Sequence, residues 1–166
     1  MAAGAARASV RKMPAILFVC TGNLYRSPLA AAFFRLLLDS HGLHDWPTDS
    51  VGTWARTGQA APAAVVRVAA QFGARLESHR SQLIRAETLS NFDLVLVMER
   101  GHKEALDVEF PAFAPRVHLL SRVVDGLDYD IPDPLVSGEG VDALAASLHE
   151  TLERGFKSIC ALASDL

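Results

Sequence analysis

The sequence predicts an α/β fold with a single open, four-stranded parallel sheet and helices on both of its faces. Strand-like and helix-like segments alternate along the chain, which is the pattern of strand–helix–strand connections. The segment Leu94–Met98 is apolar throughout, as expected of a strand that is buried on both faces of a parallel sheet. The length of 166 residues suits one domain, and no internal repeat or low-complexity linker divides it.

The first half of the chain contains two predicted strands and two predicted helices. Ala15–Val19 is a short apolar run that reads as the first strand. A helix rich in Ala and Leu is expected over Pro28–Ser40, and Thr48–Val51 follows as a second, short strand. The helix Pro62–Phe72 begins with proline, which suits the first helical position, and is ended by Gly73.

The second half continues the alternation. Ala86–Ser90 is expected to form a brief helical turn before the central strand Leu94–Met98. Gly101–Leu106 has a helical pattern, and Arg116–Leu119 is the last predicted strand. A long amphipathic helix over Gly140–Ala163 closes the chain.

Composition narrows the classes of protein and of partner. Half of the residues are hydrophobic and 21 % are charged, as in an ordinary globular domain. The net charge of −3 argues against a nucleic-acid or anionic-membrane surface. Two cysteines, at positions 20 and 160, provide neither a disulfide framework nor metal-ligand spacing. We therefore expect a cytoplasmic protein, monomeric or weakly dimeric, without a metal or organic cofactor.

The first residues differ from the rest. Residues 1–12 are Ala-rich and contain three basic side chains, and the apolar run that follows is too short for a signal peptide. We expect residues 1–12 to be a flexible extension and residues 13–166 to form the domain. No stretch is long enough to span a bilayer.

The most informative segment is residues 18–28, Phe-Val-Cys-Thr-Gly-Asn-Leu-Tyr-Arg-Ser-Pro. Cys20 ends a strand, Arg26 follows six positions later, and a helix begins next. Gly22 and Asn23 tolerate left-handed backbone, so the loop can curl its N–H groups around a tetrahedral anion. The helix N-terminus adds positive potential and favours a thiolate. The expected phosphate-binding residues are Thr21, Gly22, Asn23, Leu24, Tyr25, Arg26 and Ser27.

These residues suit hydrolysis of phosphate monoesters. Cys20 would attack phosphorus and form a cysteinyl-phosphate, while Arg26 binds two phosphate oxygens. Ser27 would hydrogen-bond the Cys20 sulfur and favour its thiolate. The alternatives remain open at this point: Cys20 as an ordinary buried thiol at a strand end, and Ser27 as a helix N-cap before Pro28.

A proton donor for the leaving group is expected in the Pro-, Gly- and Asp-rich segment 126–140, which reads as a surface loop. Four aspartates in or beside this segment compete, and each alone is more typical of a turn or cap residue. They are Asp125, Asp128, Asp130 and Asp133.

The loop resembles the phosphate loop of the low-molecular-weight protein tyrosine phosphatases, and the resemblance extends over almost the whole chain. Ser50-Val-Gly-Thr53 resembles the Ser-Ala-Gly-Thr segment of that family, and Ser78–Gln82 resembles its Ser-His-x-Ala-Arg region. Asp93–Glu99 and Ile131-Pro-Asp-Pro134 resemble its third strand and its late Asp-Pro motif. The resemblance implies the flavodoxin-like phosphotyrosine phosphatase I fold, phosphotyrosine proteins as substrates and inorganic phosphate as product.

The resemblance also implies roles for individual residues. It selects Asp133 as general acid and base. It implies that Asn23, Ser50 and His79 hydrogen-bond with Ser27 beneath the loop. It places four residues near the pocket wall: Trp54, Arg56, Tyr129 and Leu135. By analogy with bacterial members, a partner could be a bacterial tyrosine kinase.

Two departures from the family pattern stand out. Tyr25 occupies a position where many relatives have a second cysteine, and Leu135 replaces an aromatic residue that stacks on the substrate ring. An arsenate reductase is an alternative function, but residues 80–100 contain no cysteine and Cys160 stands alone. A phosphate-binding module without turnover is the other alternative, although Cys20 and its proposed partners are all present.

Overall fold

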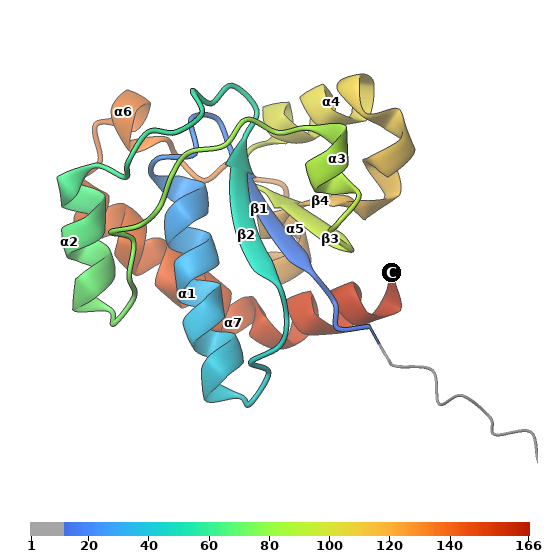
Figure 1. Cartoon of the computed structure of the whole chain (residues 1–166), viewed down its shortest axis with the longest axis horizontal. Helices are drawn as coiled ribbons and strands as arrows, with labels where there is room; N and C mark the ends of the chain where they lie inside the picture. The colour runs from blue at the N-terminus through green and yellow to red at the C-terminus, as the bar shows by residue number, and fades with distance from the viewer. Residues whose placement is uncertain (1–11) are drawn as a thin grey trace, which may run out of the picture.

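The computed structural model describes residues 12–166 and contains one four-stranded parallel sheet with helices on both faces, as predicted (Figure 1). Residues 1–11, most of the predicted extension, lie outside the described part. The elements are β1 (Ile16–Cys20), α1 (Arg26–Ser40), β2 (Thr48–Gly52), α2 (Ala63–Gln71), α3 (Ala86–Leu89), β3 (Leu94–Val97), α4 (Arg100–Glu109), the 3₁₀ helix η1 (Pro111–Arg116), β4 (Val117–Leu119), α5 (Leu120–Asp125), α6 (Pro134–Ser137) and α7 (Val141–Asp165).

The strand order is β2-β1-β3-β4, and all neighbouring pairs are parallel. The chain leaves β1 toward β2 on one side, and later returns to β3 on the other side of β1. The carboxyl end of β1 is therefore a topological switch point, where open α/β sheets bind their ligands. In Figure 1 this end of the sheet is at the top, where the loops after β1 and β2 gather near α6.

Side chains alternate along the strands and build a separate hydrophobic core on each face of the sheet. On β1, Ile16, Phe18 and Cys20 belong to one core, and Leu17 and Val19 belong to the other. The first core is covered by α1, α2 and α7, and the second by α3 and α4. The β1 strand is thus fully buried and gives a rigid base to the loop that follows it.

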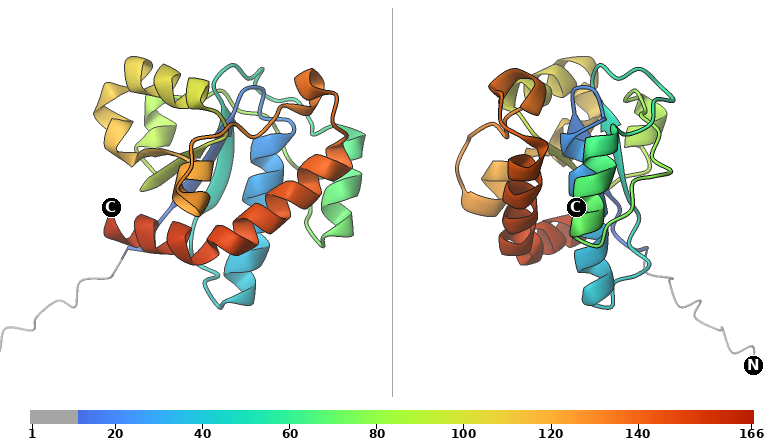
Figure 2. Two further views of the ribbon diagram at one scale, coloured as in Figure 1. Left: turned by 180° about the vertical axis from the view of Figure 1, so that it is seen from behind. Right: turned by 90° about the vertical axis from the view of Figure 1, so that its left-hand side faces the viewer.

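The long helix α7 runs across the molecule behind α1 in Figure 1, and lies in front when the molecule is seen from behind in Figure 2. It packs against α1, α5 and α2. Its approach to α5 is close, because a Cβ on Gly155 would lie 2.3 Å from a methyl carbon of Val124. No described helix has both the length and the apolar character that crossing a bilayer requires.

Several boundaries differ from those predicted. The helix α1 begins at Arg26, two residues before Pro28, so Ser27 lies inside its first turn and Tyr25 is the N-cap. The N-cap interpretation of Ser27 was therefore wrong. Three short elements of four to six residues, η1, α5 and α6, were not predicted, although the equally short α3 was.

Candidate active site

The loop between β1 and α1 surrounds a small cavity of about 50 Å³ at the switch point of the sheet. The lining residues are Cys20, Gly22, Leu24, Tyr25, Arg26, Asp133 and Leu135. Larger hollows lie elsewhere on the described surface, including one of about 390 Å³ between α4 and α5. The small cavity combines the Cys20 thiol with the buried guanidinium of Arg26, and its size suits a compact anion rather than a large ligand.

Backbone donors are plentiful around this cavity. Within residues 12–166, the N–H groups of residues 22–27 donate to no other group of the protein. No side chain caps α1 either, and its first turn has no acidic residue. Free N–H groups at a helix N-terminus form an anion-binding site, so a bound phosphate would provide the missing acceptors.

Cys20 is buried at the end of β1, and its Sγ lies 3.0 Å from Oγ of Ser27. Ser27 Oγ also accepts a hydrogen bond of 2.9 Å from Nδ2 of Asn23, and lies 3.3 Å from the Val51 carbonyl. Its single proton can therefore go either to that carbonyl or to the sulfur. When Cys20 is a thiolate, the sulfur is the stronger acceptor, and the Ser27 hydroxyl stabilises its charge.

Asn23 is the only residue other than glycine with positive φ among residues 12–166, at 57°. Its side chain explains why this conformation persists. Nδ2 donates to Ser27 and, over 2.9 Å, to Oγ of Ser50, while Oδ1 accepts from the N–H of Gln82. Its carbonyl accepts a 2.8 Å hydrogen bond from Nε2 of His79. The structure thus brings together all four residues that were predicted beneath the loop.

The end of β2 supports the loop from the other side. Thr53 and Trp54 donate backbone hydrogen bonds of 2.9 and 3.0 Å to the carbonyls of Cys20 and Thr21. Gly52 lies so close that a Cβ there would be 2.4 Å from the Thr21 carbonyl oxygen. Glycine at this position is a condition for bringing the two segments together.

Arg26 is 2 % exposed and its guanidinium is held at both η nitrogens. Nη1 forms an ion pair with Glu99 and donates over 2.9 Å to the Ile131 carbonyl. Nη2 lies 3.4 Å from Oγ1 of Thr21 and 3.5 Å from Oδ2 of Asp133. A buried charge requires such partners, and they fix the fork of the guanidinium before any phosphate arrives.

Asp133 enters the cavity from the loop that connects α5 to α7. It is the N-cap of α6, and Oδ1 accepts a 3.0 Å hydrogen bond from the Leu135 N–H. The backbone N–H of Ile131 donates to the Met98 carbonyl, which ties this loop to the end of β3. Among the four competing aspartates, Asp133 is the one that lines the cavity. Asp125, Asp128 and Asp130 pair instead with Arg154, Arg122 and Arg100, respectively.

The four residues predicted near the pocket wall lie in three different places. Leu135 lines the cavity beside Leu24 and Tyr25. Trp54 and Arg56 line an adjacent hollow of about 420 Å³, which shares Gly22 and Leu24 with the cavity. Tyr129 lines neither of them.

Tyr129 does not line the cavity, and its hydroxyl donates to Asp125 over 2.5 Å. The ring therefore fastens the loop to the α5 side of the molecule. This placement depends on a contact that the sequence pattern did not reveal.

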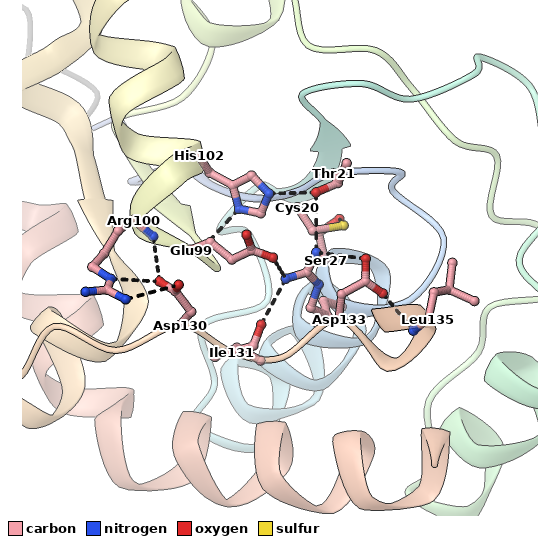
Figure 3. Close-up of polar contacts among 11 residues, drawn as sticks. Cys20, Thr21, Ser27, Glu99, Arg100, His102, Asp130, Ile131, Asp133 and Leu135 are labelled. Atoms are coloured by element: carbon pink, nitrogen blue, oxygen red, sulfur yellow. Dashed lines mark hydrogen bonds and ion pairs between the residues drawn. The ribbon is translucent and has the colours of Figure 1, made fainter. Parts of the chain in front are cut away.

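Two residues of the site had no predicted role: Glu99, the partner of Arg26, and His102. Figure 3 shows His102 between Glu99 and Thr21. Its Nε2 lies 2.8 Å from Oγ1 of Thr21, and its Nδ1 accepts a 3.1 Å hydrogen bond from the Glu99 N–H. Burial lowers the pKa of His102, although the nearby Glu99 carboxylate opposes this effect.

Comparison with known proteins agrees with this geometry. The family model "Low molecular weight phosphotyrosine protein phosphatase" matches residues 15–163. The chain belongs to this family. It is 37 % identical to a protein-arginine-phosphatase of Geobacillus stearothermophilus over 119 residues, which cover 72 % of this chain and 77 % of the relative. It is also 37 % identical to a low molecular weight protein-tyrosine-phosphatase of Streptomyces coelicolor over 131 residues, 74 % of this chain and 79 % of the relative.

A solved structure of similar fold is directly informative about the chemistry. It is the arginine phosphatase YwlE, as a cysteine-to-serine mutant with a phosphorylated active site serine. It superposes with a TM-score of 0.80 at 29 % identity, covering 87 % of this chain and 95 % of YwlE. This chain is accordingly a phosphatase of the low molecular weight family with a cysteine nucleophile. The other cysteine, Cys160, lies in α7, and burial raises the pKa of its thiol to about 11, which makes it a poor partner for thiol exchange.

Proposed function

We propose that this protein hydrolyses phosphotyrosine in proteins and that Cys20, Arg26 and Asp133 carry the reaction. Cys20 attacks phosphorus, the bond from phosphorus to the phenolic oxygen breaks, and Asp133 protonates the departing phenolate. Water then attacks the cysteinyl-phosphate, Asp133 accepts a proton, and inorganic phosphate leaves with Cys20 again a thiolate. Arg26 and the free N–H groups of the loop neutralise the phosphoryl oxygens in both steps.

The observation that carries the substrate class is the apolar part of the cavity lining. Leu24, Tyr25 and Leu135 line the cavity together with Cys20, and Asp133 is the one acidic side chain among the lining residues. An aromatic ring gains by burial between such walls. A guanidinium would have to bury N–H donors against side chains that offer few acceptors, which is costly.

A second candidate is phosphoarginine, because two of the relatives described above are named arginine phosphatases. The phosphate loop and the nucleophile would serve either substrate. What distinguishes the two substrates is therefore the wall of the cavity rather than its base.

The two candidate substrates can be distinguished by measuring kcat/KM for two peptides of otherwise identical sequence, one with phosphotyrosine and one with phosphoarginine. Both assays contain EDTA. We expect phosphotyrosine to be preferred by about tenfold or more, which corresponds to roughly 1.4 kcal/mol of differential stabilisation. Cys20→Ser is the inactive control. Leu135→Phe should raise kcat/KM for phosphotyrosine about 2- to 10-fold by restoring an aromatic contact. Faster hydrolysis of phosphoarginine would support the second candidate instead.

Partners and location follow from the same chemistry. A tyrosine kinase would generate the substrate, and we propose a bacterial one, since the relatives named above come from bacteria. A cysteine thiolate persists best in a reducing compartment, which favours the cytoplasm.

A further inference from the structure

His102 connects Thr21 and Glu99, two of the residues that contact the Arg26 guanidinium, although it forms no hydrogen bond with Arg26 itself among residues 12–166. It lies in the first turn of α4, and Glu99 is the N-cap of that helix. The backbone N–H of Glu99 can only donate, so Nδ1 of His102 must carry a lone pair. In the neutral ring Nε2 then carries the hydrogen and donates to Thr21.

Glu99 is fixed twice in this arrangement. Its carboxylate accepts from the His102 backbone N–H, and its own N–H donates to the His102 ring, which forms a reciprocal capping box. The same carboxylate pairs with Nη1 of Arg26. The position of that carboxylate therefore depends on the first turn of α4 and on the His102 ring.

Thr21 is fixed in a similar way on the other side. Its hydroxyl oxygen accepts from Nε2 of His102 over 2.8 Å and faces Nη2 of Arg26 over 3.4 Å. One imidazole thus orients a contact to each η nitrogen of the Arg26 guanidinium, which lies far away in the sequence. Arginine has many rotamers, and holding it in the bound geometry beforehand lowers the cost of binding an anion.

We infer that His102 is a positioning residue for the phosphate-binding Arg26, acting through Thr21 on one side and Glu99 on the other. The inference rests on the phosphatase activity but not on the choice between phosphotyrosine and phosphoarginine. Positioning Arg26 stabilises every bound species that contains a phosphoryl group, namely substrate, transition state and product phosphate. Loss of the contacts made by His102 should therefore weaken the binding of phosphate and of substrate to a similar extent and leave kcat nearly unchanged.

Two substitutions of His102 test the contacts of its two ring nitrogens separately. His102→Asn keeps an acceptor near Nδ1, so the cap of α4 is retained, but it is too short to reach Thr21. His102→Gln places an amide donor near Nε2, so the contact with Thr21 is retained while the cap is lost. Thr21→Val removes the hydroxyl with little change in shape.

The experiment measures the inhibition constant of inorganic phosphate with p-nitrophenyl phosphate as substrate, its Kd by calorimetry, and the Tm. His102→Asn and Thr21→Val should each lower the affinity for phosphate about 3- to 10-fold. The double variant should bind phosphate no more weakly than either single variant, because both substitutions remove the same contact. His102→Gln should lower the Tm but stay closer to wild type in phosphate affinity. His118→Asn is the matched control, because that ring lies near the Pro115 carbonyl instead, and it should leave phosphate affinity unchanged.

Two results would overturn the inference. One is wild-type phosphate affinity in His102→Asn, and the other is multiplicative losses in the double variant. Calorimetry keeps this test separate from the proposed function. If the wild type binds phosphate but turns over no substrate, the proposed function fails while the positioning of Arg26 is still measured.

Discussion

At the scale of single residues, the proposed role of Asp133 as acid and base depends on the two contacts of its carboxyl. Its Oδ2 lies 3.5 Å from Nη2 of Arg26, and its Oδ1 accepts a hydrogen bond from the Leu135 N–H. A phosphoryl group bound by Arg26 would therefore lie beside this carboxyl, where the leaving oxygen needs a proton.

Asp133→Asn should therefore slow hydrolysis in proportion to how poor the leaving group is. With a phosphotyrosine peptide, whose leaving group has a pKa near 10, we expect a loss in kcat/KM of roughly 10²–10⁴. With p-nitrophenyl phosphate the loss should be smaller, because nitrophenolate leaves without protonation. The measurement is kcat/KM for a series of aryl phosphates. An equal loss across the series would remove Asp133 from the role of acid.

With Tyr25 in place of a second cysteine, we expect the nucleophile to be more vulnerable to irreversible oxidation. No thiol stands beside Cys20 in the loop, and the second cysteine lies in α7. Peroxide oxidises a thiolate to a sulfenic acid, and without a neighbouring thiol to form a disulfide the oxidation continues to irreversible acids. After peroxide treatment, dithiothreitol should restore only part of the activity of wild type and more of the activity of Tyr25→Cys. Complete recovery of wild type would count against this view.

At the scale of elements, the contact between the end of β2 and the phosphate loop requires glycine. Gly52→Ala would bring a Cβ to 2.4 Å from the Thr21 carbonyl oxygen and 2.9 Å from Cβ of Ala55. We expect a loss of about 1–3 kcal/mol in the free energy of unfolding and weaker phosphate binding, because the loop must shift.

Gly101→Ala in α4 provides the matched control for this substitution, since no atom lies within 4 Å of its added Cβ. It should be neutral or stabilising by about 0.5–1 kcal/mol. Urea denaturation and the phosphate inhibition constant measure both effects. Equal behaviour of the two variants would contradict the steric argument.

The segment after β2 provides a second test at this scale. Trp54 is 85 % exposed, and with Arg56 it lines the hollow beside the catalytic cavity. We expect a small aryl phosphate to contact the walls of the cavity but not the hollow, and a phosphopeptide to extend into the hollow. Trp54→Ala should therefore lower kcat/KM for a phosphotyrosine peptide about 2- to 10-fold, by loss of a ring contact, and leave p-nitrophenyl phosphate unaffected. Equal losses on both substrates would place Trp54 in the catalytic cavity itself.

At the scale of the whole molecule, the sequence predicted what local pattern determines. All four strands were predicted to within one residue at each end. For β1 and β3 the signal is an unbroken apolar run, which is typical of buried parallel strands. The strands β2 and β4 contain polar residues and were predicted from the alternation of strand-like and helix-like segments. The nucleophile, its arginine and the switch point were predictable because they lie in one short segment. The pairing of Arg26 with Glu99 joins residues 73 positions apart, and the place of His102 depends on how α4 packs. Such contacts follow from the assembled fold and not from sequence spacing.

The dependence of stability on pH is also a property of the whole molecule. Burial lowers the pKa values of His102 and His118 below their ordinary value of 6.5. The unfolded chain therefore binds more protons than the folded one once the pH falls below about 6.5, so the free energy of unfolding falls with it. A second loss follows at lower pH, because hydrogen bonds from Arg154 and Arg122 lower the pKa values of Asp125 and Asp128 from 3.8.

The histidine contribution can be isolated by substitution. A variant carrying both His102→Asn and His118→Asn should lose most of the decline in the free energy of unfolding between about pH 7 and pH 5, since neither side chain can then take up a proton. His44→Asn, at an exposed position, is the control and should retain the wild-type slope. Urea denaturation at several pH values measures the slope directly. If the double variant keeps the wild-type slope, His102 and His118 do not cause the loss of stability in mild acid. The carboxylates paired with arginine could not cause it either, because they remain ionised between about pH 7 and pH 5, and the explanation by buried histidines would be wrong.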